Sequence, residues 1–143
     1  MANRNDPFGN FNFLVEIGGV TKAGFSEVSG LDAELEPIEY RTGDEDITVR
    51  KIPGLKKFSN ITLKRGFTAD LSLWNWMKQG LDGKVLRTTM SITLLDESRQ
   101  PVLRWNIRQA WPCKWEGPEL NAKGNDIAIE TLEICHEGIE LAE

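Results

Sequence analysis

Apolar and polar residues alternate along most of this chain, and this period of two is typical of β-strands, whose successive side chains point to opposite faces. The alternation is clearest in Phe11–Ile17, Ser59–Arg65 and Thr89–Leu95. Further segments have the same character, and these are Leu35–Tyr40, Ile47–Ile52, Val102–Ala110 and Asp126–His136. The pattern therefore predicts a mainly β fold of about seven strands.

Residues 69–80 are the exception, because their apolar side chains recur at helical spacing. The side chains concerned are Leu73, Trp74, Met77 and Leu81. Thr68 or Asp70 can cap the start of this helix, and Gly80 can supply a left-handed residue at its end. We expect a compact β-barrel or sandwich with one short flanking α-helix, built as a single domain from residues 1–143.

Two of the predicted strands show irregularities in their sequence. Proline has no N–H, so Pro53–Gly54 is expected to end the strand that precedes it. In the last strand the apolar phase shifts from Ile127 and Ile129 to Leu132 and Ile134, which predicts a bulge or burial on both faces. The acidic residues of this region are expected on a solvated face and tail, and they are Glu130, Glu133, Glu137 and Glu140.

The composition excludes several classes of protein. A chain of 143 residues, 40% apolar and 27% charged, has the size and character of one folded domain. Its net charge of −5 disfavours binding to nucleic acid through phosphate contacts. Met1–Pro7 lacks the apolar stretch of a secretory signal, and no apolar run approaches the roughly 20 residues that cross a bilayer. We therefore expect assembly in the cytoplasm, with Cys113 and Cys135 kept as thiols.

The chain offers little for catalysis. His136, the one histidine, directly follows Cys135, and neighbouring residues of a strand point to opposite faces. A small hydrolase built from Cys113 and His136 stays open only if the fold brings these two together. Three soft ligands without a fourth make a poor zinc set, and the sequence has no phosphate-binding glycine loop. We expect no enzymatic activity, no cofactor and no metal.

Five tryptophans raise another possibility. Core packing accounts for Trp74 and Trp105. Trp76 on the helix, Trp111 at the end of a strand and Trp115 in the following turn could instead form an aromatic platform for a ligand. A monomeric carbohydrate- or peptide-binding β-domain is therefore the alternative function. Contacts between subunits, where tryptophan is enriched, are the other use for these side chains.

The region from Leu31 to Lys57 separates its charges by sign. Its first arm and turn are acidic and contain Glu34, Glu36, Glu39, Asp44, Glu45 and Asp46. Its return arm is basic and contains Arg50, Lys51, Lys56 and Lys57. Such a hairpin can pair its charges across its own strands, or with a copy of itself in a neighbouring subunit. Charge alone leaves both arrangements open, together with a merely solvated hairpin.

Longer blocks of sequence are more specific. The first are Asp6–Phe8, Phe11–Ile17 and Ala23–Leu31, followed by Glu39–Arg41, Arg50–Gly54 and Lys56–Gly66. The later ones are Leu94–Glu97, Trp105, Ala110–Pro112, Gly117–Pro118, Ile127–Glu133 and His136–Gly138. In this order, and over nearly the whole chain, they resemble the contractile phage-tail-tube-like family. That family includes contractile phage tails, tail-like bacteriocins and extracellular contractile injection systems.

The resemblance implies a structural role as a tail tube protein. Six copies of a β-barrel with one flanking helix would close into a ring, and the rings would stack by self-assembly into a hollow inner tube. An outer contractile sheath would drive this tube through a target envelope. The implied partners are further copies of the chain, the sheath protein, baseplate or spike and tube-cap proteins, and protein cargo in the lumen. The resemblance implies neither direct membrane binding nor sequence-specific nucleic-acid binding. The assembled phage-like particle is either released from the cell or anchored in it.

Within this family the segments Leu31–Ile52 and Thr88–Trp111 look like the two hairpins that supply the tube wall. The predicted interface and lumen residues are Phe25, Leu31 and the charged residues of both hairpin arms. The phase of the strands, and hence the identity of the lumen-facing side chains, stays open at this point.

Overall fold

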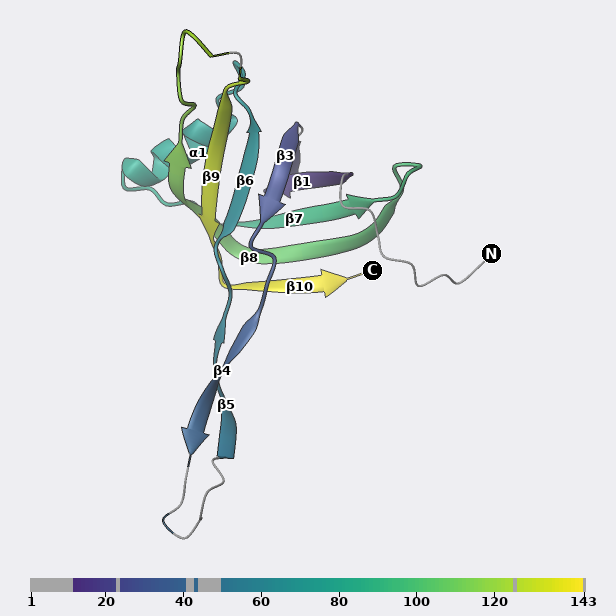
Figure 1. Ribbon diagram of the computed structural model, residues 1–143, viewed down its shortest axis with the longest axis vertical. Helices are drawn as coiled ribbons and strands as arrows, with labels where there is room; N and C mark the ends of the chain where they lie inside the picture. The colour runs from purple at the N-terminus through teal and green to yellow at the C-terminus, as the bar shows by residue number, and fades with distance from the viewer. Residues whose placement is uncertain (1–11, 23, 41–42, 44–49, 125, 143) are drawn as a thin grey trace.

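The computed structural model describes residues 12–22, 24–40, 43, 50–124 and 126–142. Its strands form one large sheet and one separate two-stranded ribbon, with a single α-helix in these ranges (Figure 1). The large sheet contains β1 (Phe13–Ile17), β2 (Val20–Lys22), β3 (Phe25–Ser29), β6 (Ile61–Gly66), β7 (Thr88–Leu95), β8 (Pro101–Glu116), β9 (Ile129–Cys135) and β10 (Gly138–Ala142). The ribbon contains β4 (Glu34–Tyr40) and β5 (Arg50–Lys57), and the helix is α1 (Ser72–Leu81). A mainly β fold with one short helix is thus confirmed.

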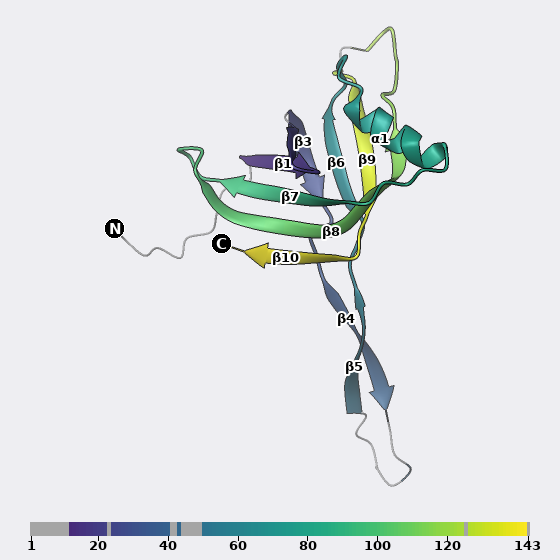
Figure 2. The same ribbon diagram turned by 180° about the vertical axis from the view of Figure 1, so that it is seen from behind.

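The long strand β8 belongs to both halves of the large sheet. The strand order is β2-β1-β7-β8-β9-β6-β3, with β10 also paired to β8 and every pair antiparallel. Between the two halves, Arg108 and Gln109 together face Thr89, and Gln109 has a φ of 53°. This bulge lets β8 bend, so the β1–β7–β10 half and the β9–β6–β3 half lie across each other as two layers (Figures 1 and 2).

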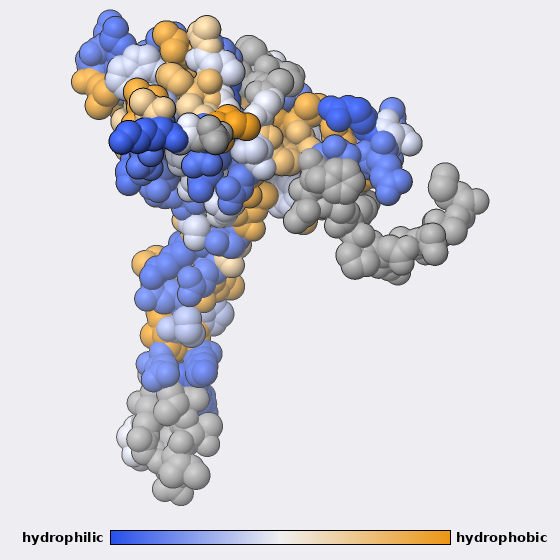
Figure 3. Space-filling view, turned by 45° about the horizontal axis from the view of Figure 1, so that its top comes forward, coloured by the Kyte–Doolittle hydropathy of each residue, from blue (hydrophilic) through white to orange (hydrophobic). Residues whose placement is uncertain are grey.

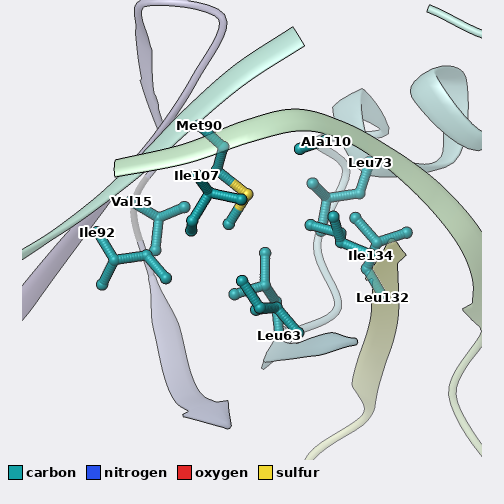
Figure 4. Close-up of a cluster of buried hydrophobic side chains, with 10 residues drawn as sticks. Val15, Leu63, Leu73, Met90, Ile92, Ile107, Ala110, Leu132 and Ile134 are labelled. Carbon is teal, nitrogen blue, oxygen red and sulfur yellow. The ribbon is translucent and has the colours of Figure 1, made fainter. Parts of the chain in front are cut away.

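The hydrophobic core fills the space between these layers (Figure 4). Its buried side chains come from both halves of the sheet and from α1, and they are Val15, Ile61, Leu63, Leu73, Met90, Ile92, Ile107, Ala110, Leu132 and Ile134. Burying each of the larger ones stabilises the fold by about 1.5–3 kcal/mol. The two halves of the large sheet and the helix are therefore held by one continuous core, to which the described residues of the ribbon contribute no side chain.

The helix starts and ends later than predicted. It begins at Ser72 rather than near residue 69, because the side chain and the carbonyl group of Asp70 are both bound by Arg65 of β6. Asp70 still supports the first turn, since its Oδ1 accepts a hydrogen bond from the Ser72 N–H at 3.0 Å. Gly80 lies inside the helix, and the left-handed residue is Gly83 with a φ of 86°. Among the described residues, no helix has the length and apolar character needed to cross a membrane.

Strand boundaries also differ from expectation. β5 runs through Pro53 and Gly54, because a strand of a two-stranded ribbon has a free edge where proline needs no N–H. β8 continues to Glu116, so Trp115 lies in a strand and not in a turn. The short strands β2, β3 and β10 contain too few alternating apolar residues to be predicted from period alone. Residues 47–49 of the predicted return strand lie outside the described residues.

The bulge predicted for the last strand lies on its partner. β9 keeps one phase throughout, and its buried residues are Glu130, Leu132 and Ile134. Ile127 and Ile129, which suggested a second phase, are exposed. The register shift falls on β8 at Cys113. The sequence interpretation was wrong here because it placed the charged Glu130 on the solvated face.

Candidate assembly interface

The ribbon β4–β5 projects from the body of the protein and pairs with no other strand in the described part of the chain (Figures 1 and 2). Across the ribbon Glu34 faces Lys57 and Glu39 faces Lys51. The Lys57 ammonium group also lies 3.4 Å from Glu36 Oε2. The acidic and basic arms therefore pair within one chain, and opposite charges facing each other in this way favour a single strand register.

The same ribbon exposes large apolar side chains (Figure 3). Ile38 and Ile52 are direct cross-strand partners, and about half of each is exposed. Leu35, Tyr40 and Leu55 are exposed as well, Leu55 to 72%. An isolated two-stranded hairpin is only marginally stable in water, and exposed apolar surface of this kind marks a site of protein contact. The ribbon therefore has the character of a surface that another chain covers.

Gly54 sets how closely the two arms approach. A Cβ atom on this residue would lie 2.5 Å from the Glu36 carbonyl oxygen and 3.0 Å from Ile38 Cγ1. The register shifts at the same place, between Leu35 and Pro37, so that β5 carries an extra residue there. The shape of the ribbon thus depends on a residue without a side chain at position 54.

The remaining predicted interface residues lie elsewhere. Phe25 of β3 and Leu31, which follows it, are half-buried beside the core. Both line an open groove between β3 and the other layer, together with Phe13, Ile92 and Trp105. The structure therefore separates the predicted residues into two surfaces, the ribbon with both charged arms and this groove. The residues Asp44, Glu45 and Asp46 lie outside the described residues.

Cys113 and His136 have separate partners and do not form a dyad. His136 Nε2 lies 2.9 Å from the Ser59 carbonyl oxygen, and its Nδ1 accepts a hydrogen bond from the Gly138 N–H at 3.1 Å. Burial, followed by the neighbouring Cys135 thiol and then a carboxylate, raises the pKa of Cys113 to about 12. A thiol with that pKa is protonated at neutral pH and is a poor nucleophile. In the part of the chain that the structure describes, no three His, Cys, Asp or Glu side chains are placed to hold a metal ion.

One of the three tryptophans proposed as a platform has its partners in the interior. Trp115 packs against Trp74 with ring centroids 5.0 Å apart, and its indole N–H donates to Glu130 Oε2 at 3.0 Å. Trp76 lies on α1 and Trp111 on β8 before its second bulge. Trp115 thus serves the interior, which removes one of the three side chains from any common ligand platform.

A buried ion pair is the feature that sequence reasoning missed. Arg65 Nε donates to Glu130 Oε1 at 2.5 Å, and the two side chains are 5% and 1% exposed. Arg65 Nη2 also donates to the Asp70 carbonyl at 3.0 Å. With Trp115, these residues join β6, β8 and β9 to the start of α1. The sequence contained one signal for this pair. Glu130 lies two and four residues before Leu132 and Ile134, so it shares their buried face of the strand.

Comparison with known proteins agrees with this geometry. A family model described as T4-like virus tail tube protein gp19 matches residues 9–140. A chain in the structure of the sheath–tube complex of PVC, an extracellular contractile injection system, in its extended state is 28% identical, with a TM-score of 0.87 over 96% of this chain and 93% of that one. A chain in the structure of the anti-feeding prophage cap is 26% identical, with a TM-score of 0.88 over 99% and 95%. No curated protein sequence matches the chain.

One solved structure with lower sequence identity has the same fold. Hcp1 from Flavobacterium johnsoniae is 16% identical, with a TM-score of 0.65 over 90% of this chain and 93% of that one, and shares the fold. The family match, in contrast, spans residues 9–140, which include both arms of the ribbon and all the strands of the large sheet up to the first residues of β10. The chain therefore belongs to the T4-like virus tail tube protein family.

Proposed function

We propose that this chain is the subunit of the inner tube of a contractile injection system or phage-like tail. Six copies close into a ring, and the rings stack into a hollow conduit. Family membership supports the tube role, and the likeness to chains from a sheath–tube complex and a tube cap supports an injection system. The observation that carries the proposal is the ribbon β4–β5, whose charged and apolar surfaces are exposed in the single chain.

The ribbon acts in this proposal as the contact between neighbouring copies. Its exposed Ile38, Ile52 and Leu55 gain a partner surface on assembly, which removes apolar area from water. Its charges pair across its own two arms, as Glu39 with Lys51, and hold the register of the ribbon that presents this apolar surface. The groove lined by Phe25 and Leu31 is the second interface element, since it is the other open apolar surface predicted for this purpose.

The hairpin β7–β8 supplies the wall of the tube. Its solvent face is polar: Arg104 Nη2 donates to Ser91 Oγ at 3.1 Å, and Arg104 Nε donates to Asn106 Oδ1 at 3.0 Å. Glu16 of β1 lies 3.6 Å from the same guanidinium group. We assign this face to the lumen, because its opposite face is the core and a water-filled channel needs a polar lining. The outer edges of β2 and β10 are unpaired in the described chain and available to neighbouring subunits.

The partners follow from this position. A sheath surrounds the tube, a baseplate lies at one end and a cap at the other, and the lumen can hold protein cargo. The subunit itself carries out no chemical step, since the sheath supplies the work. Residues 1–143 act as one domain, and assembly takes place in the cytoplasm before the phage-like particle functions.

Sedimentation velocity of charge-swapped variants tests this function. Lys51→Glu places two like charges opposite each other in the ribbon, at Glu39, and is expected to shift rings and tubes to monomers without lowering the thermal midpoint of the body. Lys114→Glu is the matched control, because Lys114 is an exposed lysine on the body whose ion pair is with Glu116. Assembly of the Lys51→Glu protein at the wild-type concentration would contradict the role of the ribbon.

A further inference from the structure

The two cysteines lie on adjacent antiparallel strands, at the second bulge of β8. Cys113 is the residue at which the register shifts, between Pro112 and Lys114, and Cys135 of β9 is the partner of Trp111. Both residues are half-buried free thiols. The fold thus brings two thiols that are distant in sequence to neighbouring places on one sheet.

The contacts of Cys113 place both thiols on the same face of that sheet. Cys113 Sγ lies 3.5 Å from the carbonyl oxygen and 3.6 Å from Oε2 of Glu133. Glu133 and Cys135 are two residues apart on β9, and residues with this spacing share a face. Asn60 holds the Glu133 carboxylate with a hydrogen bond of 3.0 Å. The raised pKa of Cys113, to which the Cys135 thiol contributes, is consistent with this proximity.

We propose that Cys113 and Cys135 form a reversible cross-strand disulfide between β8 and β9 when the folded protein meets a small-molecule disulfide. The pair is a site of thiol oxidation and not a metal site, because no three His, Cys, Asp or Glu side chains among the described residues are placed to hold a metal ion, although the Glu133 carboxylate lies near Cys113. This inference does not depend on ring assembly, since both cysteines belong to one chain.

The exchange proceeds in two steps that balance. The Cys135 thiolate attacks one sulfur of the small-molecule disulfide, so that a mixed disulfide forms and one small thiolate leaves. Cys113 then loses its proton and attacks the Cys135 sulfur, which expels the second small thiolate. The two protein thiols are oxidised to one disulfide, the reagent is reduced to two thiols, and the two protons pass to the leaving groups. Cys135 acts first because Cys113 is held protonated.

The disulfide would close the long connection between β8 and β9. This connection carries the exposed Leu120 and Ile127, and the loop closed by the disulfide consists of the end of β8, this connection and β9, whose last residue is Cys135. Closing a loop of this length restricts the unfolded chain, so the oxidised protein is expected to melt about 5–10 °C higher than the reduced one.

Peptide mapping of the full chain tests the proposal. The native protein is incubated with oxidised glutathione, alkylated and digested with trypsin without reductant. Cleavage at Arg108, Lys114 and Lys123 separates the cysteines into peptides 109–114 and 124–143. The expected result is one linked pair of these peptides, a protein that migrates as a monomer without reductant, and loss of the link after reduction.

The same digest contains the results that overturn the proposal. Two alkylated cysteines after oxidation, two separate glutathione adducts, or a link between two chains would each refute the intramolecular bond. Cys113→Ser is the matched control, because it can only collect an adduct at Cys135. The thermal midpoint of this variant should not rise on oxidation, and a rise equal to that of the wild type would also contradict the disulfide.

Discussion

Replacement of Glu130 by glutamine should lower the free energy of unfolding more than neutralisation of any exposed charged side chain. Glutamine keeps the size of the side chain, so the variant creates no cavity. It removes the buried carboxylate partner of the Arg65 guanidinium group, whose side chain is 5% exposed, and leaves Arg65 with the longer ion pair to the exposed Asp70, at 3.4 Å. It also replaces one of the two oxygens that Arg65 and Trp115 bind with a donor group. Breaking a buried pair by removing one partner costs about 3–5 kcal/mol.

The size of this loss can be compared with the stability of the whole domain. Native proteins have a free energy of unfolding of about 5–15 kcal/mol, so the variant should lose a large fraction of its stability. With a urea dependence of about 2 kcal/mol per molar, a loss of about 3 kcal/mol lowers the unfolding midpoint by about 1.5 M. Intrinsic fluorescence of the five tryptophans follows the transition, and Trp115 is one of the reporters because its indole N–H binds Glu130. The measurement is made at a concentration where sedimentation shows a monomer.

Two controls separate charge from packing. Glu116→Gln removes the partner of Lys114 on the surface, at 2.9 Å, and should leave the urea midpoint unchanged because both side chains are more than half exposed. Arg65→Met combined with Glu130→Leu removes both charges and should recover much of the lost stability. A midpoint for Glu130→Gln equal to that of Glu116→Gln would refute the buried ion pair as a structural link.

Three further predictions follow from single positions. Gly54→Val should abolish assembly in sedimentation while the thermal midpoint of the body stays unchanged, because the new side chain meets the Glu36 carbonyl and Ile38 in the ribbon; wild-type assembly would contradict this. Gly30→Ala should cost about 2 kcal/mol or more in urea unfolding, since Gly30 has a φ of 92° and its Cβ would overlap Asn60; an unchanged midpoint would refute it. Below its pKa of about 12, the Cys113 thiol of the folded protein should react with iodoacetamide far more slowly than the same thiol in urea. The rate of this reaction should rise tenfold for each pH unit. Equal rates in the folded and unfolded protein would disprove the raised pKa of Cys113.

The sequence was most informative where one face of a strand is buried. The alternation in Ser59–Arg65 and Thr89–Leu95 predicts β6 and β7 to within two residues at each end, because burial of one face enforces the period. The same alternation fails for β10, whose first residue is Gly138 and whose last residues are exposed. In the ribbon, Leu35–Tyr40 predicts β4 to within one residue, but the end predicted for β5 was wrong, because Pro53 does not interrupt a strand whose two faces are both solvated in the single chain.

The candidate interface could be predicted in part. Opposite charges on the two arms left open pairing within the hairpin, pairing with a neighbouring copy and a merely solvated hairpin, and the structure shows the first, since Glu39 faces Lys51. Nothing in the local pattern predicts that Arg65 and Glu130, far apart in sequence, meet in the interior. That contact depends on the register between β6 and β9, which is a property of the folded sheet. The proximity of Cys113 and Cys135 depends in the same way on a bulge in β8.

Negative-stain electron microscopy of the purified protein tests the central claim most directly. The tube proposal predicts six-fold rings or stacked hollow tubes, which Lys51→Glu disperses and Lys114→Glu leaves intact. Single small particles at high concentration and at several salt levels, in a protein that is fully folded by circular dichroism, would contradict a self-assembling tube subunit.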